Sequence, residues 1–392
     1  MTSLKDLFLL DPSVVFLNHG SFGACPRPVF EVYQNWQREL ERQPVEFLGR
    51  RSTELMAVAR AKLAAYLGTD AGDVVYFPNP TTAISMVVRS LELKPGDEIL
   101  TTDHEYGAMD RTWRFLCSQT GWKYVRREIP LPVTTHTELV EHFWAGVTAR
   151  TRIIFISHIT SPTALTFPVR QICQRARQAG ILTIVDGAHA PGQIPTSLTD
   201  LGADIYTGAC HKWLCAPKGS AFLYARREVQ DRLEPLVVSW GWESETPGHS
   251  QFIDYHEWQG TRDLAAFLAA PAAIEFQHQH DWDTVRHHSR ALASETRRRL
   301  NALTGLDPIC PDSPEWFTQM VTVRLPQTDL DGLKSRLYQE YRIEAPLFKW
   351  NDQHFLRLSF QGYNSHADAD ALVQALTNLL RGAQPAAPCG QT

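Results

Sequence analysis

The sequence predicts an α/β protein with a large domain built on a mainly parallel seven-stranded sheet and a smaller C-terminal α/β domain. The chain has 392 residues, which is more than one ordinary hydrophobic core accommodates. From residue 74 onward, short apolar segments alternate with longer amphipathic ones, as strands alternate with helices. The short segments are apolar on both faces, which is typical of parallel strands covered by helices on both sides.

The elements follow in chain order. Residues 28–67 have apolar side chains at helical spacing, with a predicted break near Gly49. The strands are expected at Val74–Phe77, Glu98–Thr101, Lys123–Arg126, Arg152–Ser157, Ile181–Asp186, Ala203–Thr207 and Ala221–Ala225. The helices between them are expected at Thr81–Leu91, Ala108–Thr120, Thr137–Ala149 and Val169–Ala179.

The alternation stops near residue 238. Residues 238–260 are rich in Trp, Gly and His and are predicted to form a loop at the edge of a site. A long helical stretch over 264–301 comes next, followed by strands near 319–324 and 354–360 that flank a helix near 331–341. The expected division is an N-terminal segment (1–27), a large domain (28–262), a small domain (263–382) and a disordered tail (383–392).

Composition excludes several classes of protein. The net charge of -5 gives no electrostatic reason to bind nucleic acid or an anionic membrane surface. The N-terminus lacks the basic region and sustained apolar core of a signal peptide, and no apolar run reaches the roughly 18 residues that span a bilayer. The seven cysteines are dispersed and form no CxxC pair, which argues against a disulfide framework or a metal site. We therefore expect a cytoplasmic protein.

Asp186 ends one predicted strand, where ligands bind in open α/β sheets. A carboxylate there can pair with the protonated pyridine nitrogen of pyridoxal phosphate and keep the ring an effective electron sink. His189, three residues on, could then hydrogen-bond the phenolic oxygen of the cofactor. The alternative is an aspartate that only caps a turn.

Lys212 lies in a glycine-bearing loop between the predicted strands that end at Thr207 and begin at Ala221. Its apolar neighbours Trp213 and Leu214 could lower its pKa, the condition for imine formation with an aldehyde. An isolated loop lysine is usually a surface residue. Asp186, at the end of a neighbouring strand, is what favours a cofactor site here.

Two further strand ends carry candidates. Thr81 and Thr82 open a helix directly after a strand, where free N–H groups, the helix dipole and hydroxyls can hold a phosphate. The local alternative is an ordinary N-capped helix. His104 and Tyr106 follow the next strand, and either ring could stack on the pyridine ring or serve only in packing.

With these residues, the chain resembles the class V aminotransferase family of fold-type I pyridoxal-phosphate enzymes, and within it the isopenicillin N epimerase-like branch. The likeness covers about residues 15 to 380. It rests on the motifs Phe16-Leu17-Asn18-His19-Gly20-Ser21-Phe22-Gly23, Asn79-Pro80-Thr81-Thr82, Glu105-Tyr106-Gly107-Ala108, Asp186-Gly187-Ala188-His189-Ala190-Pro191-Gly192, His211-Lys212-Trp213-Leu214, Pro217-Lys218-Gly219 and Gly260-Thr261-Arg262-Asp263.

The resemblance implies that Lys212 is the Schiff-base lysine, Asp186 the partner of the pyridine nitrogen and His189 the group near the phenolic oxygen. It also implies cofactor contacts from Thr81, Thr82, His211 and either Tyr106 or His104. Where many relatives have a hydroxyl or amide side chain just before the lysine, this chain has Ala209-Cys210-His211. The phosphate would then depend more on His211 and on backbone groups.

The resemblance further implies a homodimer in which Thr261 reaches the phosphate held by the other subunit. Arg357 matches the arginine that holds the α-carboxylate of an amino-acid substrate, a role that suits its planar fork. Asn18 and His19 would close over the substrate. Trp242, in the 238–260 loop, and Arg262 are candidates for substrate selectivity, the alternative being an interface-packing loop.

The implied chemistry is removal of the Cα proton of an amino acid by Lys212, with epimerisation as the leading reaction. A second proton donor would be needed on the opposite face, from Tyr106, His104 or His19. A C–S β-lyase and an aminotransferase are the alternatives, and a non-catalytic binding protein is the remaining one. Residues 326–355 contain no cysteine, which argues against desulfurase chemistry through a persulfide.

Overall fold

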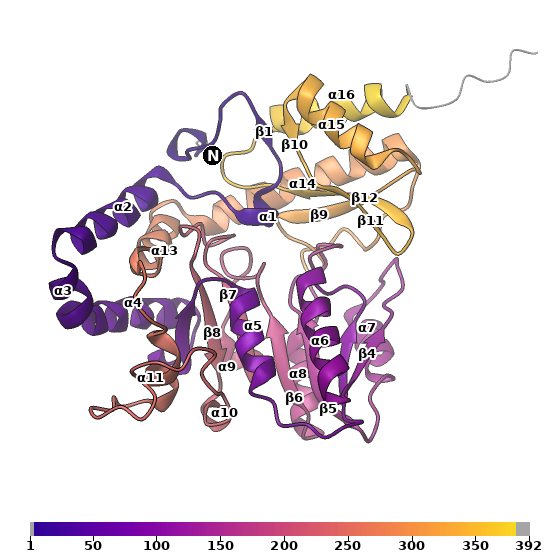
Figure 1. Ribbon diagram of the computed structural model, residues 1–392. Helices are drawn as coiled ribbons and strands as arrows, with labels where there is room; N and C mark the ends of the chain where they lie inside the picture. Colours follow the sequence, from indigo (N-terminus) through magenta and orange to yellow (C-terminus); the bar gives the residue numbers. More distant parts are fainter. Residues whose placement is uncertain (1–3, 382–392) are drawn as a thin grey trace, which may run out of the picture.

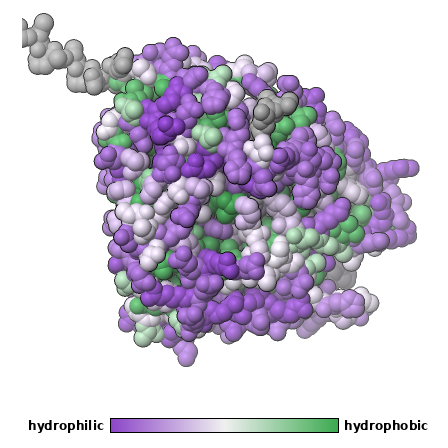
Figure 2. All heavy atoms as spheres, turned by 180° about the vertical axis from the view of Figure 1, so that it is seen from behind, coloured by the Kyte–Doolittle hydropathy of each residue, from purple (hydrophilic) through white to green (hydrophobic). Residues whose placement is uncertain are grey.

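The computed structural model describes residues 4–381, so the predicted tail at 383–392 lies outside the described residues. Figure 1 shows a large sheet in the lower half of the molecule and a smaller sheet above it, with α1 (His19–Phe22) between them. From behind, the surface is mostly hydrophilic, and hydrophobic residues are visible in a recess near its middle (Figure 2). None of the helices between residues 4 and 381 is long and apolar enough to cross a membrane.

All seven predicted strands join one sheet in the order β2-β8-β7-β6-β5-β3-β4. Its strands are β2 (Val74–Phe77), β3 (Glu98–Thr102), β4 (Lys123–Arg127), β5 (Thr151–Ser157), β6 (Leu182–Asp186), β7 (Ile205–Ala209) and β8 (Ala221–Ala225). β8 is antiparallel to β2 and β7, and the other pairs are parallel. The mainly parallel sheet is thus confirmed. β8 reverses because the loop from β7, which carries Lys212, has no crossover helix.

Helices cover both faces of this sheet. Val75 and Phe77 of β2 pack in one hydrophobic cluster with α5 (Pro80–Arg89) and α6 (Gly107–Thr120). Their neighbours Val74 and Tyr76 pack in a second cluster on the other face, as the two-residue period of a strand requires. The helices of that second face are α4 (Ser52–Tyr66), α7 (His136–Trp144), α8 (Val169–Gln178) and α9 (Leu198–Leu201).

A helical arm precedes the sheet. It consists of α2 (Arg27–Arg42), α3 (Pro44–Glu46), a π-helical turn at Phe47–Arg51 and α4, with short 3-10 turns at Lys5–Leu7 and Ala71–Asp73. The helical stretch is interrupted at Gln43, before Pro44, rather than at Gly49, where the helix only changes to a π-helical turn.

The C-terminal unit has an antiparallel sheet in the order β11-β12-β9. Its elements are α14 (Trp282–Thr304), β9 (Met320–Leu325), α15 (Leu330–Tyr341), β10 (Ile343–Glu344), β11 (Leu347–Trp350), β12 (Gln353–Ser359) and α16 (His366–Arg381). β10 pairs in parallel with β1 (Val15–Phe16), which attaches the N-terminal segment to this unit. β10, β11 and α16 were not predicted from sequence.

Two predicted segments differ in the structure. The stretch 264–301 is three helices, α12 (Ala265–Leu268), α13 (Ala270–Gln279) and α14. Ala269 separates the first two, and Asp281, with a φ of 45°, interrupts the stretch after α13 and caps α14 through Thr284 N. The 238–260 segment contains α11 (Gln251–Glu257), capped by Ser250, after the short α10 (Arg227–Gln230). The domain boundary at 262/263 stays a prediction; α12 and α13, which follow it, pack on α2 and α4.

Candidate active site

A cavity of about 170 Å³ lies beyond the carboxyl ends of β5 and β6, beside the N-terminus of α5. Parallel strands bring their carboxyl ends to one edge, so Ser157 of β5 lies directly opposite Asp186 of β6. The structure brings six of the sequence-predicted residues to this cavity: Thr81, Tyr106, Asp186, His189, His211 and Lys212.

Lys212 and Asp186 have shifted pKa values in this cavity. Burial lowers the pKa of the Lys212 amine to about 8, with a further lowering by Arg357 and an opposing effect of Asp186. Burial raises the pKa of Asp186, although the Ala188 N–H donates to its Oδ1 at 3.0 Å and Lys212 acts in the opposite direction. A lysine with this pKa is partly deprotonated at neutral pH and can act as a nucleophile and base.

His189 is held in one tautomer by Trp213. The Trp213 indole Nε1–H donates to His189 Nδ1 at 3.2 Å, so the neutral ring carries its proton on Nε2. That Nε2 is 3.4 Å from Lys212 Nζ. Burial holds the pKa of His189 well below its usual value, so the ring stays neutral. Trp213 was read from sequence only as an apolar neighbour of the lysine; its role in orienting His189 required the structure.

We expect the cofactor-free protein to form an imine with an aldehyde at a rate that rises with pH and reaches half of its maximum near pH 8. The reason is that half of the Lys212 amine is in the reactive neutral form at its pKa of about 8, whereas an ordinary lysine needs a pH near 10.5. The rate can be followed by visible absorbance after pyridoxal phosphate is added. Asp186→Asn should move this midpoint to lower pH, because the Asp186 carboxylate favours the ammonium form; a midpoint near pH 10 would contradict the assignment.

The N-terminus of α5 is capped by Asn79. Its side-chain oxygen accepts from Thr82 N at 2.8 Å and from Thr82 Oγ1 at 3.1 Å. The Thr82 hydroxyl therefore donates to the cap, and Thr82 does not line the cavity. Its contact with a phosphate stays a prediction. Thr81 and His211 do line the cavity. The N-terminus of α5, which lies beside them, is therefore the part of the cavity that favours an anion.

His104 faces away from the cavity. Its Nδ1 is 2.7 Å from Thr163 Oγ1, its Nε2 is 3.0 Å from the Ile129 carbonyl, and its ring meets Trp350 edge-on. Both nitrogens of this buried ring therefore have partners in the protein. Of the two rings predicted for stacking, the cavity holds Tyr106.

The N-terminal residues Asn18 and His19 do not point into the cavity either. Asn18 Nδ2 donates to Glu344 Oε1 at 3.0 Å, and its Oδ1 accepts from Ser21 Oγ. His19 is fully buried behind the lysine loop. Ser21 and Phe22, which follow in the same motif, line the cavity instead, because the short helix α1 turns the chain toward it.

Thr261, Arg262 and Trp242 do not line the cavity of their own chain. Arg262 Nη2 donates to the Glu257 carbonyl, and its guanidinium lies 4.7 Å from the centre of the Phe267 ring. Thr261 is exposed, and Trp242 is 44% exposed. Any contact of these residues with a substrate or phosphate would have to be made in another subunit.

Arg357 does not line the first cavity but a second one of about 320 Å³, and the two cavities share Tyr106 and Ser161. Its Nη1 donates to the Ser161 carbonyl and hydroxyl, at 2.5 and 3.2 Å, and its Nη2 donates to Ser21 Oγ at 3.2 Å. Within residues 4–381, no carboxylate pairs with this buried guanidinium, and its Nε has no partner. Burial lowers the pKa of Arg357 to about 10.

Glu105 was not predicted as a site residue. Burial, together with Asp186, raises the pKa of its carboxyl to about 8, against the effect of two hydroxyl donors. These donors are Thr102 Oγ1 and Ser157 Oγ, both at 2.6 Å. At neutral pH Glu105 is therefore mainly protonated, and it adds little negative charge beside Asp186. The sheet register places Ser157 opposite Asp186, and Ser157 bonds Glu105. Only this arrangement could have indicated that the Glu105 carboxyl lies near that of Asp186.

Comparison with known proteins identifies a family that matches most of the chain. Residues 25–372 match the model of the aminotransferase class-V family. The chain is 38% identical over 383 residues to isopenicillin N epimerase of Amycolatopsis lactamdurans, covering 94% of this chain and 96% of that protein. It is 36% identical to isopenicillin N epimerase of Streptomyces clavuligerus (95% and 96% covered) and 27% identical to a probable L-cysteine desulfhydrase of Arabidopsis thaliana (95% and 84% covered).

Among solved structures, the apo cysteine desulfurase of Thermococcus onnurineus NA1 superposes with a TM-score of 0.83 at 19% identity, covering 97% of this chain and 99% of that one. This likeness confirms the predicted α/β fold of the fold-type I enzymes. The chain belongs to the aminotransferase class-V family of pyridoxal-phosphate-dependent enzymes.

Proposed function

We propose that this protein binds pyridoxal phosphate through Lys212 and removes the Cα proton of an amino acid, as an isopenicillin N epimerase-like enzyme. The observation that carries the proposal is the Lys212 amine, whose pKa is near 8 in a cavity shared with Asp186 and His189. The cavity has the groups that the cofactor needs. They are an amine for its aldehyde, a buried carboxylate for its ring nitrogen and a helix N-terminus for its phosphate.

Bound pyridoxal phosphate supplies an electron sink that makes the Cα proton of an attached amino acid acidic. Asp186 would hold positive charge on the ring nitrogen, and His189 Nε2 faces the lysine nitrogen, 3.4 Å away. Lys212, when its amine is free, would accept the Cα proton. Of the three residues considered as a second proton donor, Tyr106 lines the cavity, so we assign it this role in the epimerase reaction.

The unpaired charge of Arg357 indicates an anionic substrate group. A buried guanidinium without a carboxylate is costly unless a ligand supplies one. Its two Nη atoms donate to Ser161 and Ser21, which are neutral, and Arg357 lines the adjoining cavity, so we assign it to the substrate α-carboxylate. The adjoining cavity has apolar walls from Phe348 and Trp350 and is large enough for a side chain bigger than that of cysteine.

Arg357→Gln is expected to raise the KM for an amino acid by about 100-fold, because losing one partner of a buried charge pair costs roughly 3 kcal/mol. Binding of the matching amine without a carboxylate should hardly change. Arg324→Gln is the control, since Arg324 lies on the neighbouring strand β9 opposite Phe355 and bonds the Asp307 carbonyl. Equal losses for the amino acid and the amine would contradict the assignment.

The reaction can be identified by incubating the protein in D₂O with L- and D-amino acids that differ in side-chain length. Deuterium at Cα with inversion and no elimination would support epimerisation. Release of pyruvate, ammonia and sulfide would instead support a C–S β-lyase, the second candidate, which the similarity to a desulfhydrase favours. Keto-acid-dependent amino transfer would indicate an aminotransferase. A colourless protein with no cofactor-dependent reaction would refute the proposal.

We further propose a homodimer with shared active sites. Leu236, Val237, Val238, Trp240 and Trp242 are all exposed and nearly consecutive, and Trp240 is 84% exposed. Such a hydrophobic patch favours a protein contact, and Thr261 is exposed nearby in sequence, as contact with a partner's phosphate requires. Light scattering should give twice the mass of the chain, and Trp240→Glu should lower it.

A further inference from the structure

His19 lies directly behind the lysine loop and bonds its backbone. His19 Nε2 is 3.1 Å from the Lys212 carbonyl oxygen, and Nδ1 is 3.0 Å from the Tyr363 hydroxyl. The imidazole also packs against Trp213, with ring centres 4.9 Å apart. His19 is completely buried, so a group predicted from sequence to contact the substrate contacts the lysine's own main chain.

The donor and acceptor roles follow from the partners. Burial lowers the pKa of His19 to about 3, so the ring is neutral and carries one proton. The Lys212 carbonyl, 3.1 Å away, can only accept, which places that proton on Nε2; the Gln361 amide nitrogen lies farther from Nε2, at 3.4 Å, and also donates to Cys215 Sγ. Nδ1 then accepts from the Tyr363 hydroxyl, whose pKa burial raises well above its usual value. The Lys212 carbonyl thus fixes the tautomer of His19, and Tyr363 supplies the donor that this tautomer requires at Nδ1.

The Lys212 carbonyl receives two donors. The Cys215 N–H closes a turn onto it at 2.9 Å, and His19 occupies the second lone pair. At the other end of the residue, His189 Nε2 faces Lys212 Nζ. Each histidine accepts at Nδ1 from an aromatic side chain, Trp213 for His189 and Tyr363 for His19.

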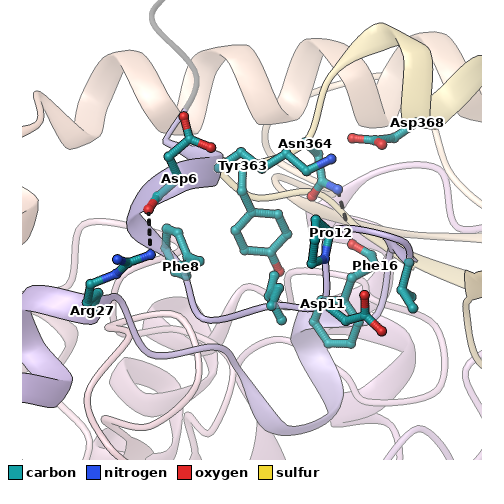
Figure 3. Close-up of a pocket in the computed structure, with 12 residues that line it drawn as sticks. Asp6, Phe8, Asp11, Pro12, Phe16, Arg27, Tyr363, Asn364 and Asp368 are labelled. Carbon is teal, nitrogen blue, oxygen red and sulfur yellow. Dashed lines mark hydrogen bonds between the residues drawn. The ribbon is translucent and has the colours of Figure 1, made fainter.

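The N-terminal segment is fixed against this loop. Gly23 has a φ of 70°, and a Cβ there would lie 2.1 Å from the His211 carbonyl oxygen, so the backbones are in close contact. Gly20 N donates to Ser359 Oγ at 3.1 Å. The Tyr363 ring, in turn, packs edge-on against Phe8 with centres 4.8 Å apart, beside the N-terminal cavity (Figure 3).

We propose that His19 and Tyr363 are positioning residues that fix the Lys212 peptide, so that the amine keeps one direction both when it holds the cofactor and when it moves the Cα proton. This inference rests on the proposed function of Lys212. The N-terminal segment would thus support the Lys212 loop of its own chain, in addition to any closure over the substrate. A proton-transfer group must be held closely, because small misplacements reduce the rate strongly.

Three variants test the proposal on the holoenzyme. His19→Gln places an amide donor near the position of Nε2 and should keep the bond to Lys212. His19→Asn reaches only the Nδ1 side and should lose it. Tyr363→Phe removes one hydroxyl, keeps the ring and leaves Nδ1 of His19 without its hydrogen-bond partner. We expect kcat to fall about fivefold or more in His19→Asn and Tyr363→Phe, with KM nearly unchanged, and His19→Gln to remain within about twofold.

The visible circular dichroism of the bound cofactor gives a readout that does not depend on turnover, since it reports the orientation of the ring. It should change in His19→Asn and Tyr363→Phe and be restored in His19→Gln. Equal behaviour of His19→Asn and His19→Gln, or normal spectra and kcat in Tyr363→Phe, would overturn the proposal. If the unmodified protein showed no cofactor signal that depends on Lys212, the proposed function itself would fail.

Discussion

Lys212→Ala is expected to abolish covalent attachment of pyridoxal phosphate and to lower kcat by about 10³-fold or more, because one residue supplies both the nucleophile and the base. After reduction with borohydride, mass spectrometry of the unmodified protein should find the cofactor on the peptide that contains Lys212. The variant should lack this adduct. An added primary amine should restore part of the activity, since only the amine is missing.

Lys218 is the matched control. It lies six positions further along the same loop, and its Nζ donates to the Gly23 carbonyl at 2.9 Å rather than to the cavity. Lys218→Ala should therefore keep the reducible adduct on Lys212. An adduct that persists in Lys212→Ala, or that disappears in Lys218→Ala while the protein remains folded, would show that the wrong lysine has been assigned.

Asp186→Asn should lower kcat by about 10² to 10³-fold and at the same time raise the thermal stability of the cofactor-free protein at neutral pH. The activity falls because an amide cannot stabilise positive charge on the ring nitrogen. The stability rises because burial holds the pKa of Asp186 above its ordinary value of 3.8. The unfolded chain thus loses this proton more readily, and ionisation favours unfolding as pH rises through the folded pKa.

The predicted change in the stability of Asp186→Asn can be measured as a difference in Tm. The Tm of the cofactor-free variant should exceed that of the unmodified protein at pH 7, and the difference should vanish below pH 3.8, where both states hold the proton. Asp204→Asn is the control, since Asp204 is equally buried but accepts from Thr183 N at 2.8 Å and from Arg226 Nη2 at 2.7 Å. That variant should lose stability at pH 7. A lower Tm for Asp186→Asn at pH 7 would contradict the argument.

The sequence alone was sufficient for the large sheet and for the centre of the candidate site. Strands that are buried on both faces must be apolar throughout, so most of the seven were visible as short hydrophobic segments between helices, and the exception is the edge strand β4, which is charged and partly exposed. The carboxyl ends of parallel strands meet at one edge, and this rule placed Asp186 and the Lys212 loop together before any side chain was located.

Only the tertiary structure decided which of the neighbouring side chains enter the cavity. His104 and Tyr106 are two positions apart in one motif, yet His104 bonds the Ile129 carbonyl and Tyr106 lines the cavity. Thr82 bonds its own helix cap, and His19 bonds the main chain of Lys212. Sequence order determines where the backbone of a motif lies in an α/β sheet. The direction of each side chain depends on the partners that packing brings to it from distant segments, and those partners are not local in sequence.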